Sequence, residues 1–171
     1  MAVLDLVIYP DDPLTKRAKP FSEIGRDEAK LAADMLDTMH AYEGVGLAGP
    51  QVGVGRQIIT VQEPGGQPRC LLNPDIVLRE GQETGEEGCL SFPELYAVVP
   101  RAERIRVIGF DEKGASVEFE AAGMLARIIQ HEVDHLSGVV FIDRLDVLSR
   151  QAKLEEWNEM RARMAAAIRK G

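Results

Sequence analysis

Hydrophobic residues recur every three or four positions in three stretches of the chain, which predicts three amphipathic helices. The stretches are residues 27–42, 123–137 and 149–169. Asp27 and Glu28 suit the start of the first helix, because the helix dipole places partial positive charge there, and Gly138 suits the end of the second. On the third helix, five apolar residues form a predicted packing face: Leu154, Trp157, Met160, Met164 and Ile168.

Short β-type runs fill the middle of the chain, and turn-forming residues separate some of them. The runs are 57–62, 70–72, 76–78, 97–99, 104–110 and 117–121. Strands this short and close in sequence favour antiparallel hairpins. The pattern therefore predicts an α+β fold, with antiparallel β-sheets around the helix at 123–137 and with an N-terminal and a C-terminal helix. We expect a single domain over 1–171, in which 149–171 forms the C-terminal helix.

Composition and charge narrow the class of protein. The 171 residues suit one domain, and 45% apolar with 28% charged residues is ordinary for a globular protein. No apolar run approaches the ~18–20 residues that span a bilayer, and residues 1–9 lack a basic leader, so we expect a cytoplasmic protein with no membrane partner. The net charge of −8 argues against DNA as a partner.

The charge is distributed unevenly along the chain. The segment 149–171 contains six Lys or Arg residues against three Glu residues, so a basic end follows an acidic body. Such a segment is usually a solvated helix face, but it also suits contact with RNA.

Two of the three histidines lie in the motif His131-Glu132-Val133-Asp134-His135. In a helix this spacing places both imidazoles on one face, where they can bind one metal ion, and it leaves Glu132 within reach of a water molecule. The motif therefore indicates a metal-dependent hydrolase. A protein in which the metal is purely structural is the non-catalytic alternative, and it requires a fourth protein ligand.

A hydrolytic site typically has three protein ligands, so one ligand remains to be found. Glu155, twenty residues after His135, has a spacing that resembles the thermolysin-like zinc peptidases. Cys89 lies in a loop-like sequence without apolar alternation, whereas Cys70 lies in an apolar run and is expected to be a buried structural thiol. On the residues alone, both Glu155 and Cys89 stay open as the third ligand.

Three segments resemble the signature motifs of the peptide deformylases, in the same order. They are Gly44-Val-Gly-Leu-Ala-Gly-Pro-Gln51, Glu87-Gly-Cys-Leu-Ser91 and Gln130-His-Glu-Val-Asp-His-Leu-Ser-Gly138. The residues Tyr9–Leu14 and Phe141–Arg144 are also similar to this family, so the resemblance covers most of the chain. One departure is Gly49, where the family usually has a second alanine. The lost methyl group is expected to loosen that segment or to widen the nearby pocket.

The resemblance implies removal of the N-formyl group from the initiator methionine of newly made polypeptides, with release of formate. It implies that Cys89, His131 and His135 bind the metal, and that Glu132 moves the protons. The side-chain amide of Gln51 and the backbone N–H of Leu90 would donate hydrogen bonds to the oxyanion.

Two further expectations concern the substrate pocket and the metal. We assign six residues to the substrate pocket: Gly44, Val45, Gly46, Glu87, Met124 and Ile128. Glu87 and Asp134 are also candidates to orient a ligating histidine. The ligand types alone suit zinc, whereas the resemblance implies one Fe²⁺ per chain, with Zn²⁺ or Ni²⁺ as replacements. Relatives with a basic C-terminal helix imply the ribosome as a partner.

Overall fold

The computed structural model describes residues 2–170, without the side chains of residues 169 and 170. Its helices are α1 (Arg26–Ala41), α2 (Gly123–His135) and α3 (Val147–Lys170), with short 3-10 helices η1 (Gly49–Val52) and η2 (Phe141–Arg144). Its strands are β1 (Gly46–Ala48), β2 (Ile58–Val61), β3 (Arg69–Glu80), β4 (Glu83–Cys89), β5 (Phe92–Arg101), β6 (Arg104–Phe110) and β7 (Ser116–Ala122). The predicted α+β class, with its central helix and two flanking helices, is confirmed.

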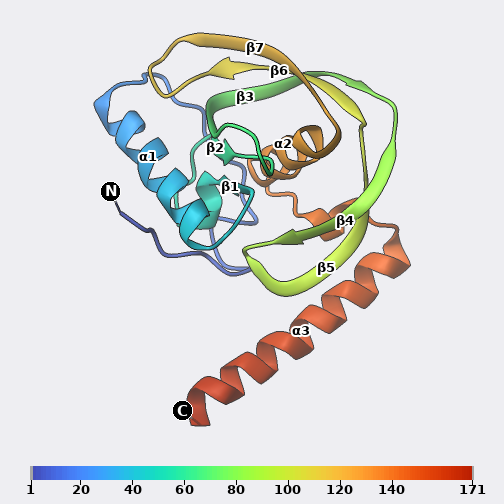
Figure 1. The fold of residues 1–171 in the computed structure, drawn as a ribbon. Coiled ribbons are helices and arrows are strands. Elements are labelled where there is room, and N and C mark those ends of the chain that lie inside the picture. The colour runs from blue at the N-terminus through green and yellow to red at the C-terminus, as the bar shows by residue number, and fades with distance from the viewer. Residues whose placement is uncertain (1, 171) are drawn as a thin grey trace.

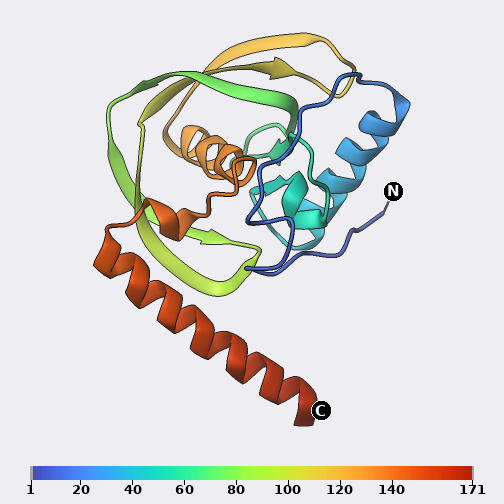
Figure 2. The same ribbon diagram turned by 180° about the vertical axis from the view of Figure 1, so that it is seen from behind.

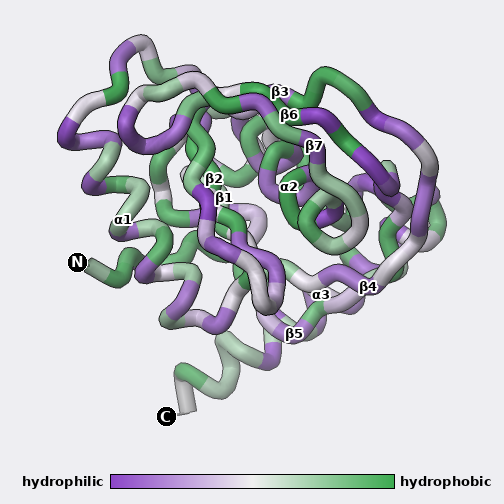
Figure 3. Tube along the Cα trace, turned by 45° about the horizontal axis from the view of Figure 1, so that its top comes forward, coloured by the Kyte–Doolittle hydropathy of each residue, from purple (hydrophilic) through white to green (hydrophobic). Residues whose placement is uncertain are grey.

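The strands form two antiparallel sheets around α2. One sheet has the order β1-β2-β3-β6-β7, and β4 pairs with β5 in the other. Figures 1 and 2 show α2 enclosed between these sheets, with α1 on the outside of the larger one. The tube in Figure 3 shows hydrophilic and hydrophobic residues interspersed along β3, β6 and β7 of the larger sheet. This arrangement places the motif-bearing helix in the interior of the protein.

Helix α2 packs against the larger sheet through its apolar residues. Ala126 and Ile129 are completely buried and belong to one cluster with Ile105 and Val107 of β6. After His135 the chain turns at Gly138, whose φ of +73° is a left-handed conformation that favours glycine. The opposite face of α2, which carries the histidines, is therefore left to face the smaller sheet.

The smaller sheet differs most from the sequence-based expectation. Strand β4 was not predicted, and its last residue, Cys89, ends a strand rather than lying in a loop. Because β4 carries mainly glycine and glutamate, it has no apolar alternation that would reveal a strand.

In the larger sheet, the two predicted runs 70–72 and 76–78 form one strand, β3, with a register irregularity between them.

Helix α3 packs against the body through residues up to Met160. Trp157 is completely buried in a cluster with residues of β5 and η2, and it donates a hydrogen bond to the Tyr9 carbonyl oxygen at 3.2 Å. Met164 and Ile168 are 41% and 78% exposed, so in the second half of α3 the predicted packing face holds for Met160 and is wrong for the other two residues. Figure 2 shows this half extending away from the body. Gly171 lies outside the described residues.

No helix within residues 2–170 is both long enough and apolar enough to span a membrane.

Candidate metal centre

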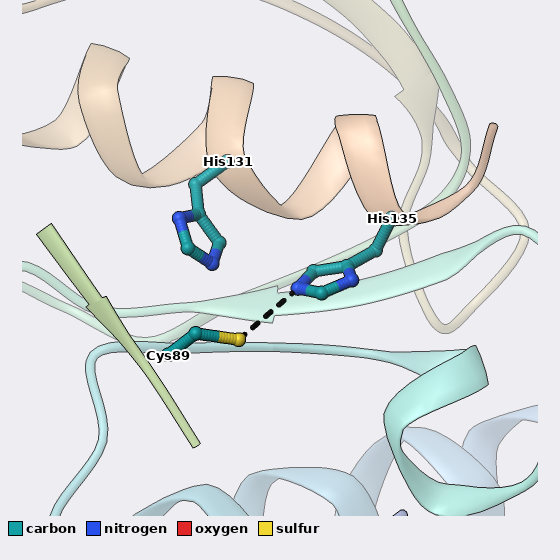
Figure 4. Close-up of side chains that lie close together, drawn as sticks. All are labelled: Cys89, His131 and His135. Carbon is teal, nitrogen blue, oxygen red and sulfur yellow. Dashed lines mark hydrogen bonds between the residues drawn. The ribbon is translucent and has the colours of Figure 1, made fainter. Parts of the chain in front are cut away.

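Three side chains converge between α2 and the end of β4. The sulfur of Cys89 and one ring nitrogen each of His131 and His135 lie within 4.8 Å of one another, and Figure 4 shows the three side chains pointing to a common centre. Cys89 Sγ is 3.4 Å from His135 Nε2. One thiolate and two imidazoles are a ligand set that suits a transition metal such as zinc or iron.

Local structure explains why these atoms meet. His131 and His135 are four residues apart in α2, so both rings leave the same face of the helix. Cys89 lies at a register irregularity of the β4–β5 pair, between Gly88 and the turn that begins β5. Irregularities of this kind often redirect a side chain beside an active site.

Glu87 fixes the orientation of His131. Its Oε1 is 2.8 Å from His131 Nδ1, so Nε2 of this ring is left for a metal. Arg101 binds both oxygens of Glu87 at 2.9 Å, and Arg127 donates to Oε2 at 2.7 Å. Burial alone would raise the pKa of Glu87, but the hydrogen bonds and charges of Arg101 and His131 outweigh it and lower the pKa to about 2.

The Asp134 side chain joins the same ionic network without a hydrogen bond to either ligating histidine within residues 2–170. It accepts hydrogen bonds from Arg101 at 2.6 Å and from Arg144 at 2.6 Å and 2.9 Å. Asp134 is therefore a salt-bridge partner of two arginines and not a residue that orients a ligating histidine. The network holds α2, β4 and β5 together beside His131.

The two histidines have opposite protonation tendencies. Burial lowers the pKa of His131, but the charge of Glu132 and the hydrogen bonds to Cys89 and Glu87 raise it well above the ordinary value. Burial and the positive charges of His131 and Arg101 lower the pKa of His135 well below its ordinary value. His135 is thus kept neutral, as a metal ligand must be, whereas the carboxylates of Glu132 and Glu87 favour positive charge at His131.

Glu132 lies next to the donors and is 4% exposed. Its Oε1 has no hydrogen-bond partner within residues 2–170. Burial raises the pKa of Glu132 to about 7, with Glu87 and Asp134 adding to the increase and His131 and Arg101 opposing it. A Cβ atom at position 46 would clash with the Glu132 side chain, which would have to move, so Gly46 leaves room for this carboxylate. A buried carboxyl with such a pKa suits proton transfer near neutral pH.

Gln51 presents its amide nitrogen to the same centre. Its Oε1 accepts a hydrogen bond from the Ala48 N–H at 2.9 Å, and its Nε2 therefore faces Ser91 Oγ at 3.2 Å and Cys89 Sγ at 3.5 Å. Ser91 is completely buried. The amide is thereby oriented as a donor beside the three metal-binding side chains.

A cavity of about 940 Å³ opens beside these groups. Its lining includes Gln51, Cys89, Leu90, His131 and Glu132. All six residues assigned to the substrate pocket from the sequence also line it, whereas His135 does not. Ile128 is buried, and Val45 and Met124 are 42% and 53% exposed. The cavity thus has an apolar wall next to the polar centre, as a side-chain pocket requires.

The structure also adds residues that the sequence analysis missed. Arg101, Arg127 and Arg144 complete the ionic network, and Ser91 anchors Gln51. Arg101 is separated from its partners by 14 and 33 residues, so no local pattern identifies it.

The fold explains why residue 49 of this chain is glycine and not alanine. A Cβ atom at this position would lie 2.7 Å from the Arg56 carbonyl oxygen and 2.8 Å from that of Val54. The following loop thus occupies the space of the missing methyl group. Gly49 is buried in η1 and does not line the cavity, so the expected widening of the pocket is wrong.

Two further candidates lie away from the centre. Glu155 is exposed on α3, where it accepts a hydrogen bond from Gln151 at 3.2 Å, and it is not part of the metal-binding group. Cys70 is half-buried in β3, and burial raises the pKa of its thiol to about 12, with the charge of Glu112 adding to the shift.

Comparison with known proteins gives one consistent result. The model of the polypeptide deformylase family matches residues 3–151. A peptide deformylase of Alkalilimnicola ehrlichii is 46% identical over 154 residues, which cover 88% of this chain and 86% of the relative.

Solved structures agree with the sequence comparison. Peptide deformylase from Thermus thermophilus superposes with a TM-score of 0.90 at 42% identity, over 94% of this chain and 96% of that one. The enzyme from Ehrlichia chaffeensis in complex with actinonin gives 0.88 at 36% identity, over 94% and 98%. The chain belongs to the polypeptide deformylase family.

Proposed function

We propose that this protein removes the N-formyl group from the formylmethionine of newly made polypeptides and releases formate. The observation that carries the proposal is the convergence of Cys89, His131 and His135 beside the buried Glu132, in a cavity of a chain that belongs to the deformylase family. This set contains the metal ligands and the proton carrier that hydrolysis of a formyl amide needs.

In the proposed mechanism the cavity positions the substrate first. The methionine side chain packs against Val45, Met124 and Ile128, while Gly44 and Gly46 allow the peptide backbone to approach closely. This contact places the formyl carbon beside Glu132 and excludes water from one side of it.

The protein's own groups then carry the chemistry. Cys89, His131 and His135 would hold a divalent ion, which when bound would act as a Lewis acid and lower the pKa of a water molecule towards ~7. Glu132 accepts the proton of the attacking water and delivers it to the departing amine nitrogen. As negative charge develops on the formyl oxygen, the Gln51 amide and the Leu90 backbone N–H donate hydrogen bonds to it, each worth ~2.7–4 kcal/mol of barrier lowering.

The direct test follows formate release from formyl-Met-Ala-Ser, with acetyl-Met-Ala-Ser as the control. The ferrous protein, prepared without oxygen, should release formate, and Glu132→Gln should lower kcat by about 10²–10⁴-fold. Actinonin, which is bound in the Ehrlichia chaffeensis structure, should inhibit the reaction. Absence of formate release by the ferrous protein rejects the proposal.

The choice of third ligand separates this function from a zinc peptidase. Cys89→Ala should lose bound metal, whereas Glu155→Ala and the matched control Cys70→Ala should retain it. The opposite result for Cys89 and Glu155 would favour the peptidase. Full metal retention in all three variants would favour a different ligand set.

We further propose that the native ion is Fe²⁺, one per chain, with Zn²⁺ or Ni²⁺ able to replace it. The thiolate together with two imidazoles suits each of these ions, and the family resemblance favours iron. Metal analysis of protein purified without oxygen from cells grown in iron-containing medium tests this assignment. Zinc alone in such protein would reject it.

The cellular context of the proposal is the cytoplasm, next to the ribosome. Arg161 and Arg163 are exposed on the free half of α3 and are available to RNA, while the side chains of Arg169 and Lys170 lie outside the described residues. Replacing Arg161 and Arg163 by Gln should weaken sedimentation with ribosomes and leave turnover of short peptides unchanged. Equal sedimentation of both forms would reject this partner.

A further inference from the structure

One arginine lies on the face that α2 turns towards the cavity. The residues of α2 in the cavity lining follow helical spacing: Met124, Arg127, Ile128, His131 and Glu132. Among the lining residues of the described chain, Arg127 is the only Lys or Arg. In the proposed function the methionine side chain of the substrate packs against Met124 and Ile128. It therefore also lies beside Arg127.

The guanidinium of Arg127 bonds both strands of the smaller sheet. Its Nη1 donates to Glu87 Oε2 at 2.7 Å and to the Val99 carbonyl oxygen at 2.8 Å. Its Nη2 donates to the Glu83 carbonyl oxygen at 2.8 Å. Gly85 leaves the space for this contact, since a Cβ atom there would lie 3.1 Å from Cζ and Nε of Arg127. These contacts fix the guanidinium between the cavity and the carboxylate of Glu87.

A single carboxylate connects Arg127 to the metal centre. Glu87 Oε2 accepts the hydrogen bond from Arg127, and Oε1 of the same side chain is 2.8 Å from His131 Nδ1. Because Arg127 and His131 both project from α2, these hydrogen bonds run from the helix to β4 and back. A stronger bond between Arg127 and Glu87 therefore holds the His131 ring more firmly.

Arg101 binds the same carboxylate from a different side. Its side chain is 3% exposed and bonded to Glu87 and Asp134, and it is not among the described residues that line the cavity. The side chain of Arg127 is 13% exposed and does line the cavity. Of these two arginines, Arg127 is thus the one whose surroundings change when a ligand fills the pocket.

Filling of the pocket should strengthen the bond between Arg127 and Glu87. Water that enters an open cavity competes for the guanidinium and screens its charge. An apolar side chain beside Arg127 displaces this water, and a charge-assisted hydrogen bond is stronger in the resulting low-dielectric surroundings. Because Nη1 already has its acceptors in the protein, the ligand needs no polar group to produce this effect.

We propose that Arg127 is a positioning residue that couples the side-chain pocket to the metal centre. A side chain that fills the pocket tightens the bond between Arg127 and Glu87, and Glu87 then holds His131 more firmly for the metal. The inference rests on the proposed function, because the methionine side chain of the substrate is the group that fills the pocket. Methionine thereby strengthens metal binding in addition to anchoring the substrate.

The experiment measures Zn²⁺ affinity by competition with a chelator, at saturating acetyl-Met-Ala-Ser or acetyl-Ala-Ala-Ser. Zn²⁺ is the probe because it is not redox-active. The two peptides share the acetyl group and the backbone, so any direct contact with the metal is common to both. We expect about three- to tenfold higher affinity with the methionine peptide. This is less than the loss of about 10–100-fold that follows removal of a group bonded to a ligand, because Arg127 acts through Glu87.

Three variants assign the effect to Arg127. Arg127→Met keeps a long side chain at the cavity without the guanidinium, so both peptides should give the same zinc affinity. Arg127→Lys keeps a charge but loses the planar fork, so the ratio between the peptides should be reduced and not abolished. Arg106→Met removes the same charge from an exposed pair with Glu120 on the larger sheet, and it should leave the ratio unchanged.

Two results overturn the inference. One is equal zinc affinity with both peptides in the unmodified protein. The other is a ratio in Arg127→Met as large as in the unmodified protein, because the coupling would then pass through other residues. Should Arg127→Met fail to fold, the folded Arg127→Lys variant decides: a reduced ratio supports the inference, and an unchanged ratio overturns it.

Formate release tests the proposed function separately. Turnover of formyl-Met-Ala-Ser without a difference in zinc affinity between the acetyl peptides rejects the coupling and leaves the proposed function standing. A difference in zinc affinity that depends on Arg127, without formate release by the ferrous protein, rejects the proposed function and retains a metal centre coupled to the pocket.

Discussion

The two cysteines of this protein lie in strands and are both half-buried, yet their surroundings differ completely. Cys70 packs among apolar residues between β3 and α1, with its sulfur 3.8 Å from the Ala32 carbonyl oxygen. Cys89 has its sulfur 3.4 Å from His135 Nε2 and 3.5 Å from Gln51 Nε2. Burial alone therefore does not determine the role of a thiol. The neighbouring donors and charges do.

The region around Cys89 is built from buried charges, and such charges stabilise a fold only as a complete set. Glu87, Arg101 and Asp134 are 7%, 5% and 7% exposed, and each is bonded to at least one of the others. The region around Cys70 needs no such network. Perturbations should consequently be severe on one side of the molecule and mild on the other.

Thiol reactivity should show the largest difference between the two cysteines. Because burial raises the pKa of Cys70 to about 12, its thiolate fraction at pH 8 is ~10³-fold below that of an ordinary thiol. Alkylation with iodoacetamide, located by mass spectrometry, should modify Cys89 in metal-free protein and leave Cys70 unmodified. Bound metal should protect Cys89. Faster modification of Cys70 would contradict the comparison.

Arg101→Met should cause the next largest effect, on the free energy of unfolding. The change leaves Glu87 and Asp134 buried without their shared partner, so we expect a loss of about 3–5 kcal/mol. Urea unfolding of the metal-free protein measures it. Cys70→Ala is the control from the apolar region, and an equal loss in both variants would contradict the proposed difference.

Glu87→Gln should weaken metal binding without removing a ligand. A neutral amide oxygen accepts the hydrogen bond from His131 Nδ1–H more weakly than the carboxylate does. The affinity for the metal should therefore fall about 10–100-fold. Competition with a chelator measures the change. Glu86→Gln, which alters the neighbouring exposed residue, is the matched control and should keep the affinity of the unmodified protein.

The smallest effect concerns the dependence of stability on pH. The pKa of Cys70 is raised on folding, so its contribution to stability is complete below the ordinary pKa of ~9 and is lost as the pH rises towards 12. Between pH 8 and pH 10 the stability advantage over Cys70→Ala should fall by about 1.4 kcal/mol. A constant difference over this interval would show that the folded protein ionises Cys70 normally.

Sequence patterns predicted the elements that carry a strong periodicity. The helices at 26–41 and 123–135 and the strand at 104–110 lie within two residues of their predicted bounds. The spacing of His131 and His135 likewise predicted that both side chains leave the same face of the helix. These features depend on neighbours in the chain, which a local pattern records.

Features that depend on distant partners were not predictable. Strand β4 buries Glu87 against Arg101, so its inward face is polar and shows no apolar alternation. Beyond Met160, α3 has apolar residues at helical spacing that the described chain leaves exposed, Met164 and Ile168 among them. Cys89 was distinguished from Glu155 by the three-motif resemblance, because neither spacing alone decided between them.

X-ray absorption at the iron edge of the ferrous protein tests the central claim most directly. We expect a coordination shell with one sulfur scatterer at ~2.3 Å and two imidazole nitrogens, which Cys70→Ala keeps, whereas Cys89→Ala should retain little iron and show no sulfur around any iron that remains. A shell of nitrogen and oxygen only in the unmodified protein, or a sulfur that persists in Cys89→Ala, would contradict it.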